Sequence, residues 1–598
     1  MPRGLLSALT AIATASLLPG ASRESFDSFS QRTEMVPMRD GVKLSSDVYL
    51  PAKGGQPVAG KFPVLVERTP YSGKGRRRSA DLLARRGYAV IIQDCRGRYA
   101  SEGKFTPFED GPDGYDTIEW AAMQPWSDGR VGTFGGSYTG MDQYYASMLR
   151  PPHLVGMFVQ MAGSSLYDSV SYPGGTPNEA WMVWLLRDAS TSQRAAQHKE
   201  AAAAIDQMIR TNLSQWMKQP PTEREKILSE FPDQREAFRD SYRHASLDTF
   251  WKARRFYTAG YYEEMKDVPM MFVTGWYDQF MDGTIEVFSA LSRMQKTEKK
   301  LMVGPWPHGI GTDTCGNATF GAGTTEDQAA LVADWFDHVL RQVPFALISD
   351  ETVQTFRMGG GNAARDQRGK LNVGGGWHTS PTWPPPGIRQ ARYYIHGDGS
   401  LNTAIPANEE ASRYEFDPAN PVPSLGGRYQ IPGVPPCVQN QNTGRLDKRP
   451  DILSYSSAPL DTRVELSGRI RASLAISSDA PDTDFTAKLM DVFPDGYASI
   501  LADGELRVRY RNSLEKPELM KPGEVYQVAI DLGSTSTLFG AGHRIRVDIS
   551  SSNFPKFEPN PNTGEAVGAW THLVKAHNVV YHDAKRLTYI DLPLAATP

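Results

Sequence analysis

The sequence predicts an α/β domain with a mainly parallel sheet, interrupted by a helical insertion and followed by an antiparallel β-sandwich. Apolar runs alternate with helical segments over residues 36–165, this alternation returns after residue 265, and a period of two replaces it after about residue 350. Alternating strands and helices are typical of a parallel sheet covered on both faces, whereas a period of two indicates half-buried strands. The 598 residues leave room for several domains.

The α/β domain is expected over residues 23–165 and 266–355, with the insertion at 166–265. Residues 63–66 and 88–92 predict its first buried strands, residues 268–273 and 301–303 its last, and residues 327–340 a closing helix. An Ala-rich segment at 199–210 predicts helix within the insertion. One domain is thus interrupted by another.

The C-terminal β domain is assigned to residues 356–598. Val464, Leu466, Ile470, Leu474 and Ile476 recur with a period of two, and a jelly roll would close about 200 such residues. The Gly/Pro-rich residues 374–387 are expected to break regular structure near the boundary. We expect this domain to cover the α/β domain and to form one wall of its cleft.

The N-terminus predicts a signal peptide over residues 1–22. Arg3 precedes an apolar stretch at 5–18, and small residues follow it. The predicted location is therefore periplasmic or secreted, and cytoplasmic if this segment is not a signal. Beyond it, no apolar run approaches the roughly 20 residues that span a bilayer, so no membrane association is expected after its removal.

Composition excludes several partners. With 64 basic and 68 acidic residues the net charge is −4, so no global field would attract nucleic acid. Cys95, Cys315 and Cys437 can form at most one disulfide, and His572, His577 and His582 would alternate between the faces of a strand. No metal site and no cofactor are predicted, and a homo-oligomer is left open.

The decisive motif lies at residues 130–140, where an apolar strand runs into Gly135-Gly136-Ser137 and then a helix. Such a turn exposes a serine in a strained backbone conformation, which is the geometry of a nucleophile elbow. Thr139 stands where the common G-x-S-x-G pattern has its last glycine, and Gly140 follows one residue later. Asp278 and His308 come in the order acid then histidine, each a few residues beyond a predicted strand, and this predicts a catalytic triad.

These residues resemble the superfamily of serine hydrolases that contains cocaine esterase, α-amino acid ester hydrolase and X-prolyl dipeptidyl-peptidase. The resemblance spans residues 35–598, and its matching motifs lie at residues 38–44, 68–71, 93–103, 109–111, 126–129, 136–138, 275–278 and 304–308. It implies an α/β-hydrolase fold, a helical cap after the sixth strand and a C-terminal jelly roll. By the same resemblance Ser137 is the nucleophile, His308 the base and Asp278 its orienting partner. The backbone N–H of Tyr138 and the hydroxyl of Tyr71 would form the oxyanion hole.

The substrate is predicted to be a small molecule with an uncharged acyl group, so the expected activity is a cocaine-esterase-like carboxylic ester hydrolase. The carboxylates that hold a substrate ammonium in the α-amino acid ester hydrolases are replaced here by Phe280 and Met281, leaving Asp168 as one weak counterpart. Tyr172, Trp181 and Trp184 are candidate lining residues. The alternatives are an acylase for amides such as β-lactam side chains, an X-prolyl peptidase, and, from another class, a non-catalytic glycan binder.

Overall fold

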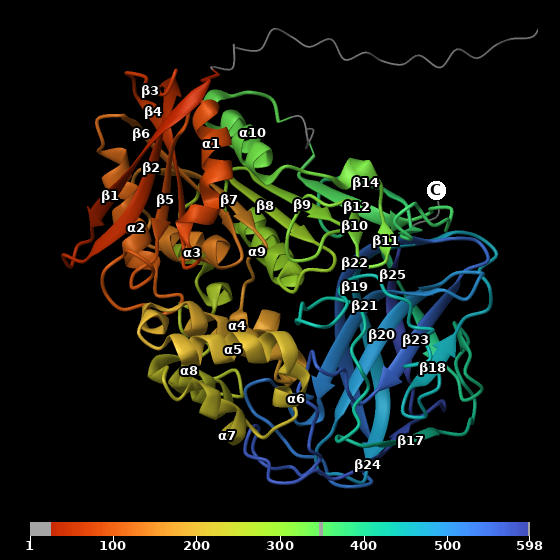
Figure 1. Cartoon of the computed structure of the whole chain (residues 1–598). Helices are drawn as coiled ribbons and strands as arrows, with labels where there is room; N and C mark the ends of the chain where they lie inside the picture. The colour runs from red at the N-terminus through yellow and green to blue at the C-terminus, as the bar shows by residue number, and fades with distance from the viewer. Residues whose placement is uncertain (1–24, 346–350, 596–598) are drawn as a thin grey trace, which may run out of the picture.

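The computed structural model describes residues 25–345 and 351–595, so the predicted signal peptide lies outside the described residues. Figure 1 shows three units: an α/β domain, a helical cap beneath it and a β-rich C-terminal domain beside both. Strands of the α/β domain and strands of the C-terminal domain together form one extended sheet. In the part of the chain that the structure describes, no helix is both long and apolar enough to cross a bilayer.

The sheet of the α/β domain is parallel after its first two pairings. Its neighbours follow the spatial order β1 (Ser28–Pro37), β2 (Lys43–Lys53), β5 (Ala89–Asp94), β4 (Phe62–Thr69), β6 (Ser127–Gly136), β7 (Leu154–Gln160), β8 (Met270–Gly275) and β9 (Lys299–Gly304). The first two pairings are antiparallel and the others parallel. The parallel strands therefore end along one edge, where an α/β sheet builds its site.

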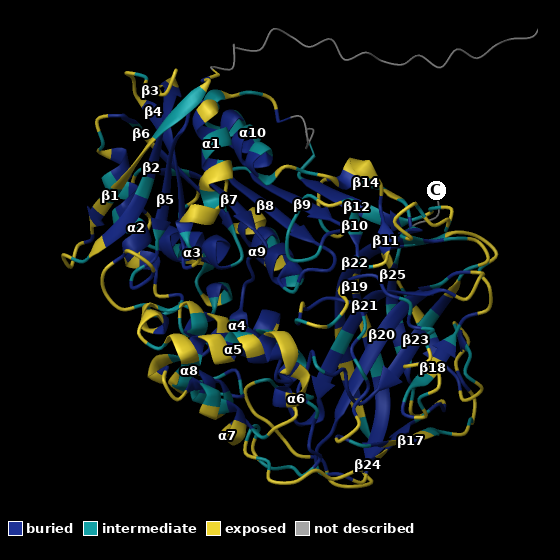
Figure 2. Cartoon of the chain, in the orientation of Figure 1, coloured by how far each residue is buried: buried dark blue, intermediate teal, exposed yellow. Residues whose placement is uncertain are grey.

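Helices cover both faces of this sheet, which explains the continuous apolar runs. On β4, Leu65 packs in a core with α1 (Arg77–Arg85) and α10 (Gln328–Arg341), whereas Val64 and Val66 belong to the opposite core with α3 (Tyr138–Ser147) and α9 (Met281–Met294). A further helix, α2 (Gly111–Ala122), packs against α3. Successive side chains of a strand point to opposite faces, so both must be apolar here. Figure 2 shows these strands as buried.

The cap lies between β7 and β8. Its helices are α4 (Glu179–Thr191), α5 (Lys199–Thr211), α6 (Leu213–Met217), α7 (Pro221–Arg224) and α8 (Pro232–Arg243). Leaving aside the two-residue β3 (Gln56–Pro57), β7 is the sixth strand of the chain. Trp216, Phe238 and Trp251 are buried and pack in the same apolar core as α4.

The C-terminal domain packs two sheets against one another. One contains β18 (Leu453–Ser456), β23 (Arg544–Ser550), β20 (Asp484–Val492) and β21 (Ala498–Arg507); the other includes β15 (Arg389–Ile395), β17 (Ser412–Phe416), β19 (Val464–Ser478), β22 (Tyr526–Phe539), β24 (Ala576–Val580) and β25 (Tyr589–Leu594). Leu466, Ile470, Leu474 and Ile476 of β19 share a buried core with residues of β20 and β23. The predicted fold class, an α/β-hydrolase with a helical insertion and a C-terminal β domain, is confirmed.

The junction between the two sheet domains is a strand rather than a linker. Strand β12 (Val353–Gly359) pairs in parallel with β9 at one end and with β22 at the other, so the boundary we drew between residues 355 and 356 falls inside it. The Gly/Pro-rich stretch also holds a strand, β14 (Gly375–Ser380), paired with β12. We predicted a break here from the local composition, which gives no information about pairing with strands that are distant in the sequence.

Candidate active site

Ser137 occupies the sharp turn between β6 and α3. Its backbone has φ 62° and ψ −125°, a strained combination for a residue with a side chain. A β-carbon on Gly135 would overlap the Thr139 Oγ1 atom, and one on Gly140 would lie 2.9 Å from the Gln160 carbonyl oxygen. Both glycines are therefore needed for the turn. Thr139 takes the place of the usual glycine by hydrogen bonding within it, since its hydroxyl accepts from the Gly136 N–H at 2.7 Å.

Asp278 and His308 meet across the ends of two neighbouring strands. Asp278 follows β8 and is fully buried, and His308 follows β9 with its side chain 26% exposed. His308 Nδ1 hydrogen bonds to Asp278 Oδ2, while the other Asp278 oxygen accepts from the Phe280 N–H at 2.6 Å. Burial opposes the charged imidazole, but the charge and hydrogen bond of Asp278 outweigh it and raise the pKa of His308 above its usual 6.5.

Ser137 and His308 line one cavity of about 980 Å³, together with Tyr71, Tyr138 and Phe280. The cavity lies where all three units meet, because the cap adds residues of α4 and the C-terminal domain adds residues 430–436. Most lining side chains are apolar, and the acidic ones are Asp188 and Asp206. Asp188 is paired with the buried Arg98 at 2.8 Å.

Tyr71 and Tyr138 differ in how they face this cavity. Tyr71 follows β4, is 39% exposed, and its hydroxyl accepts a hydrogen bond from the Trp184 indole N–H at 3.0 Å. Desolvation raises the pKa of Tyr71 above its usual 10.0, so the hydroxyl keeps its proton at neutral pH. Tyr138 is buried, and its backbone N–H belongs to the first turn of α3, where amides have no intrahelical acceptor.

Three of the five predicted substrate contacts lie in the cavity wall, namely Trp181, Trp184 and Phe280. Tyr172 does not line the cavity: its hydroxyl donates to the Ser241 carbonyl at 2.6 Å and its ring stacks on Tyr167. Asp168 is exposed and also lies outside the lining. The structure thus places neither Asp168 nor Tyr172 in the cavity wall, and for Tyr172 the sequence could not distinguish the core of the cap from its inner surface.

Asp282, four residues after Asp278, forms an ion pair with the C-terminal domain. Arg428 of the C-terminal domain donates to its carboxylate at 2.7 Å, and the Ser534 N–H donates to it at 3.0 Å. Burial alone would raise the pKa of Asp282, but the charges of Arg428 and Arg469 and the two hydrogen bonds together outweigh it and lower the pKa. Asp282 therefore holds α9 against the C-terminal domain.

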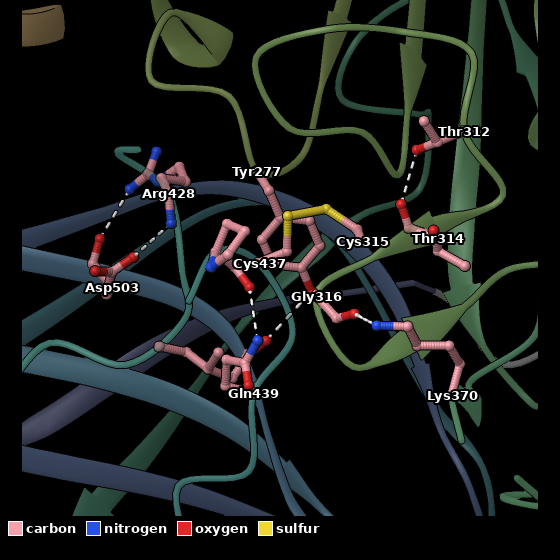
Figure 3. The surroundings of a disulfide bond; sticks show 12 residues. Tyr277, Thr312, Thr314, Cys315, Gly316, Lys370, Arg428, Cys437, Gln439 and Asp503 are labelled. Atoms are coloured by element: carbon pink, nitrogen blue, oxygen red, sulfur yellow. Dashed lines mark hydrogen bonds between the residues drawn. A yellow bond between two sulfur atoms is a disulfide. The ribbon is translucent and has the colours of Figure 1, made fainter. Parts of the chain in front are cut away.

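Sequence reasoning missed the residues that the C-terminal domain contributes. Ile431, Pro432, Val434 and Pro436 line the cavity from residues 430–436, which we call the wall loop. The disulfide between Cys315 and Cys437 joins the end of this loop to the segment that follows His308, as Figure 3 shows. Lys370 donates to the Gly316 carbonyl at 2.6 Å beside it. A Gly/Pro-rich loop has no hydrophobic periodicity, so only the pair of distant cysteines could have indicated that the wall loop lies near His308.

A buried charge cluster supports the nucleophile turn from behind. Among the described residues, one group of potential metal ligands comes close enough to share an ion: Cys95, Asp110 and Asp142. Arg68 lies among them, 2.7 Å from Asp142 and 3.4 Å from Asp110. The guanidinium already supplies the positive charge that these carboxylates need. Because Asp142 belongs to α3 and Asp110 accepts from the Tyr138 hydroxyl, the cluster fixes the start of that helix.

A parallel sheet, a serine on the turn after β6, and a histidine that lines the same cavity and hydrogen bonds to a buried aspartate are typical of serine hydrolases of the α/β-hydrolase class. Comparison with known proteins identifies the family within this class. Residues 40–310 match the X-Pro dipeptidyl-peptidase (S15 family) domain, and residues 349–591 match the C-terminal non-catalytic domain of X-Pro dipeptidyl-peptidases.

Among characterised relatives, cocaine esterase of a Rhodococcus species is 35% identical over 595 residues, covering 94% of this chain and 97% of the relative. An α-amino acid ester hydrolase and an aminopeptidase from a marine-sediment thaumarchaeote share the fold, each with TM-score 0.78, 23% identity and coverage of 98% of this chain and all of the other. The chain belongs to the superfamily of serine hydrolases that includes cocaine esterase, α-amino acid ester hydrolase and X-prolyl dipeptidyl-peptidase. It is an enzyme, so the glycan-binding alternative was wrong.

Proposed function

We propose that this enzyme hydrolyses carboxylic esters with uncharged acyl groups through a covalent acyl-enzyme on Ser137. The observation that carries this proposal is that Ser137, His308 and Tyr71 line one cavity while Asp278 hydrogen bonds to His308. Each group needed for acyl transfer is thereby present at one site.

In the first half-reaction the neutral His308 takes the proton of Ser137 as the oxygen attacks the ester carbonyl. The carbonyl oxygen becomes an oxyanion, and the Tyr138 N–H and the Tyr71 O–H donate hydrogen bonds to it. His308 then gives its proton to the departing alcohol as the C–O bond breaks. Asp278 holds the imidazole by Nδ1 and stabilises its charged form.

In the second half-reaction water replaces the alcohol. His308 removes a proton from this water as it attacks the acyl carbon, and the same two donors stabilise the second oxyanion. The Ser137–acyl bond then breaks, the carboxylic acid leaves, and the proton held by His308 returns to Ser137. The second half-reaction needs no cofactor, because water is the only other reactant.

The wall of the cavity supports the choice of acyl group. Trp181, Trp184, Phe280, Leu166 and Val170 form an apolar lining. Burying an ammonium against such a surface without a partner is costly. Asp168 and Asp282, the carboxylates that would favour an ammonium-bearing substrate, both lie outside the lining.

Initial rates test the proposal on p-nitrophenyl acetate, butyrate and benzoate, phenylglycine methyl ester, a β-lactam amide and an Xaa-Pro anilide. We expect fast hydrolysis of the neutral esters and its loss in Ser137→Ala. A preference for the amide would favour an acylase, and a preference for phenylglycine methyl ester would assign Asp188 or Asp206 to its ammonium. Preference for the anilide would favour the peptidase activity of the family.

We further propose that the protein is exported. A disulfide that joins Cys315 and Cys437 supports this location, because such bonds persist in oxidising compartments. Fractionation of the native host, with mass determination of the mature N-terminus, tests it. A cytoplasmic protein that retains residues 1–22 would contradict the proposal.

A further inference from the structure

The hydroxyl of Tyr71 is held by a side chain from another domain unit. The Trp184 Nε1–H on cap helix α4 donates to the Tyr71 oxygen at 3.0 Å, across 113 residues of sequence. Both residues line the cavity that contains Ser137. The contact therefore joins the cap directly to a group that we assign to the oxyanion hole.

This hydrogen bond has a fixed direction. An indole nitrogen can only donate, so Trp184 cannot receive the proton of Tyr71. The Tyr71 oxygen uses one lone pair for Trp184, and its own proton remains available for another acceptor. A hydroxyl that accepts a hydrogen bond also becomes a stronger donor. The arrangement thus orients the Tyr71 proton away from Trp184 and makes the Tyr71 hydroxyl a stronger hydrogen-bond donor.

Two further sets of contacts keep Trp184 in this place. Its ring lies almost parallel to that of Tyr138, at 6.3 Å between centroids and 13°, and to that of Trp181, at 5.2 Å and 10°. Tyr138 is itself anchored, because its hydroxyl donates to Asp110 and accepts from the Phe108 N–H at 2.8 Å. Trp184 therefore touches both residues whose donors would form the oxyanion hole.

A buried arginine fixes the distance between the cap and the Tyr71 loop. Arg98 donates to Asp188 of α4 at 2.8 Å and to the Pro70 carbonyl, next to Tyr71, at 3.0 Å. It is 2% exposed. With one guanidinium bonded to both segments, α4 cannot shift relative to the Tyr71 loop without breaking a buried ion pair.

We infer that Trp184 is a positioning residue for the oxyanion hole, which holds the Tyr71 hydroxyl so that its proton meets the developing oxyanion. This inference rests on the proposed role of Tyr71. It gives the cap a part in the chemical step in addition to lining the cavity. The oxyanion hole is then complete only with α4 in place.

The test is a double-mutant cycle on the purified full-length enzyme with p-nitrophenyl acetate, a substrate too small to depend on the far wall. Trp184→Phe keeps an aromatic ring in the stack and removes the N–H. We expect kcat to fall about tenfold with a smaller change in KM, because the interaction acts in the transition state. In a Tyr71→Phe background, the same substitution should lower kcat no further.

Trp181→Phe is the matched control. Trp181 lies on the same helix and lines the same cavity, but its N–H donates to the Ser241 hydroxyl at 2.8 Å. A phenylalanine at position 181 keeps a ring stacked on Trp184, so the effect of Trp181→Phe should fall on KM and be equal in the wild-type and Tyr71→Phe backgrounds. If Trp184→Phe does not fold, replacing Trp184 by benzothienylalanine keeps the ring shape, removes the N–H and is expected to give the same loss.

The outcomes separate this inference from the proposed function. Normal kcat in Tyr71→Phe would overturn the oxyanion role of Tyr71 and the inference with it. A lower kcat in Tyr71→Phe combined with normal kcat in Trp184→Phe would overturn the inference alone. So would a Trp184→Phe loss of equal size in both backgrounds, since Trp184 would then act independently of Tyr71.

Discussion

The two sides of the cavity are built in different ways. On the catalytic side, Ser137, Asp278 and His308 each sit within a few residues of the end of a parallel strand, so local backbone geometry places them. On the wall side, Trp181 comes from the cap and Ile431 and Val434 come from the wall loop, which only contacts between domains bring together. The sheet therefore places the proposed triad, whereas the fit of the substrate and, through Trp184, the position of the Tyr71 hydroxyl depend on how three units pack. Variants of the catalytic side should lower kcat, and variants of the wall side other than Trp184 should change KM.

The largest effect is expected for Ser137→Ala, which removes the nucleophile and should lower kcat about 10⁶-fold. The fluorophosphonate label that the wild type takes should be absent. Ser229→Ala, on the exposed surface of the cap, is the control and should label normally. Labelling of the folded Ser137→Ala protein would mean that the nucleophile is another residue, and Ser137 would no longer belong to the catalytic side of the cavity.

Asp278→Asn should lower kcat about 10⁴-fold, because the imidazole loses its orienting carboxylate. The base must be neutral, so activity in the wild type should fall as the pH decreases through the raised pKa of His308, with a midpoint above 6.5. In the variant only burial remains to shift this pKa, and the midpoint of kcat/KM should move below 6.5.

Asp282→Asn is the matched control, since Asp282 follows Asp278 by four residues, lies in the first turn of α9 and pairs with Arg428 instead. Its pH midpoint should stay at the wild-type value. An equal shift in both variants would mean that His308 responds to general charge rather than to Asp278.

Tyr71→Phe should lower kcat about 10²–10³-fold, the usual cost of losing one oxyanion donor. The apparent Tm should stay near that of the wild type, because the substitution removes only one hydroxyl and its hydrogen bond from Trp184 and leaves the ring in place. Tyr99→Phe controls for loss of a hydroxyl elsewhere on the cavity rim, and its kcat should change less than about threefold. A Tyr71→Phe effect confined to KM would move Tyr71 to the wall side.

Removal of the disulfide tests the wall side. Cys315→Ser/Cys437→Ser should raise KM for p-nitrophenyl benzoate about tenfold and leave kcat for the acetate nearly unchanged, because the wall loop loses its tie to the segment after His308. The free energy of unfolding should fall by about 2–5 kcal/mol. Dithiothreitol should reproduce the KM change in the wild type and have no effect on the double variant. Loss of kcat for the acetate would show that the disulfide positions His308 as well.

The smallest effect is expected for Ile431→Ala, which removes apolar surface from the wall loop. About 1 kcal/mol of lost contact would raise KM for the benzoate roughly fivefold. Val525→Ala, at an exposed position of the C-terminal domain, should change neither constant. Equal KM values for Ile431→Ala and the wild type would remove the wall loop from the binding surface.

The sequence predicted the α/β domain, the helical insertion and the β domain because each leaves a periodicity that local burial imposes. It failed where pairing is distant: β12 joins the two sheet domains, although the domain boundary that we drew falls inside its seven residues. Tyr172 shows the same limit within the cap, since an aromatic side chain in a helical insertion can face the core or the cavity.

The sequence by itself predicted the catalytic residues that we propose for this enzyme. A strand, two glycines and a serine specify the nucleophile turn, and the order of Asp278 and His308 follows from the order of the strands. The tertiary structure alone decided what surrounds that chemistry: the bond from Trp184 to Tyr71 spans 113 residues, and the disulfide spans 122. The physical reason is that a backbone turn is stabilised by its own neighbours, whereas a cavity wall exists only after separate units have packed together.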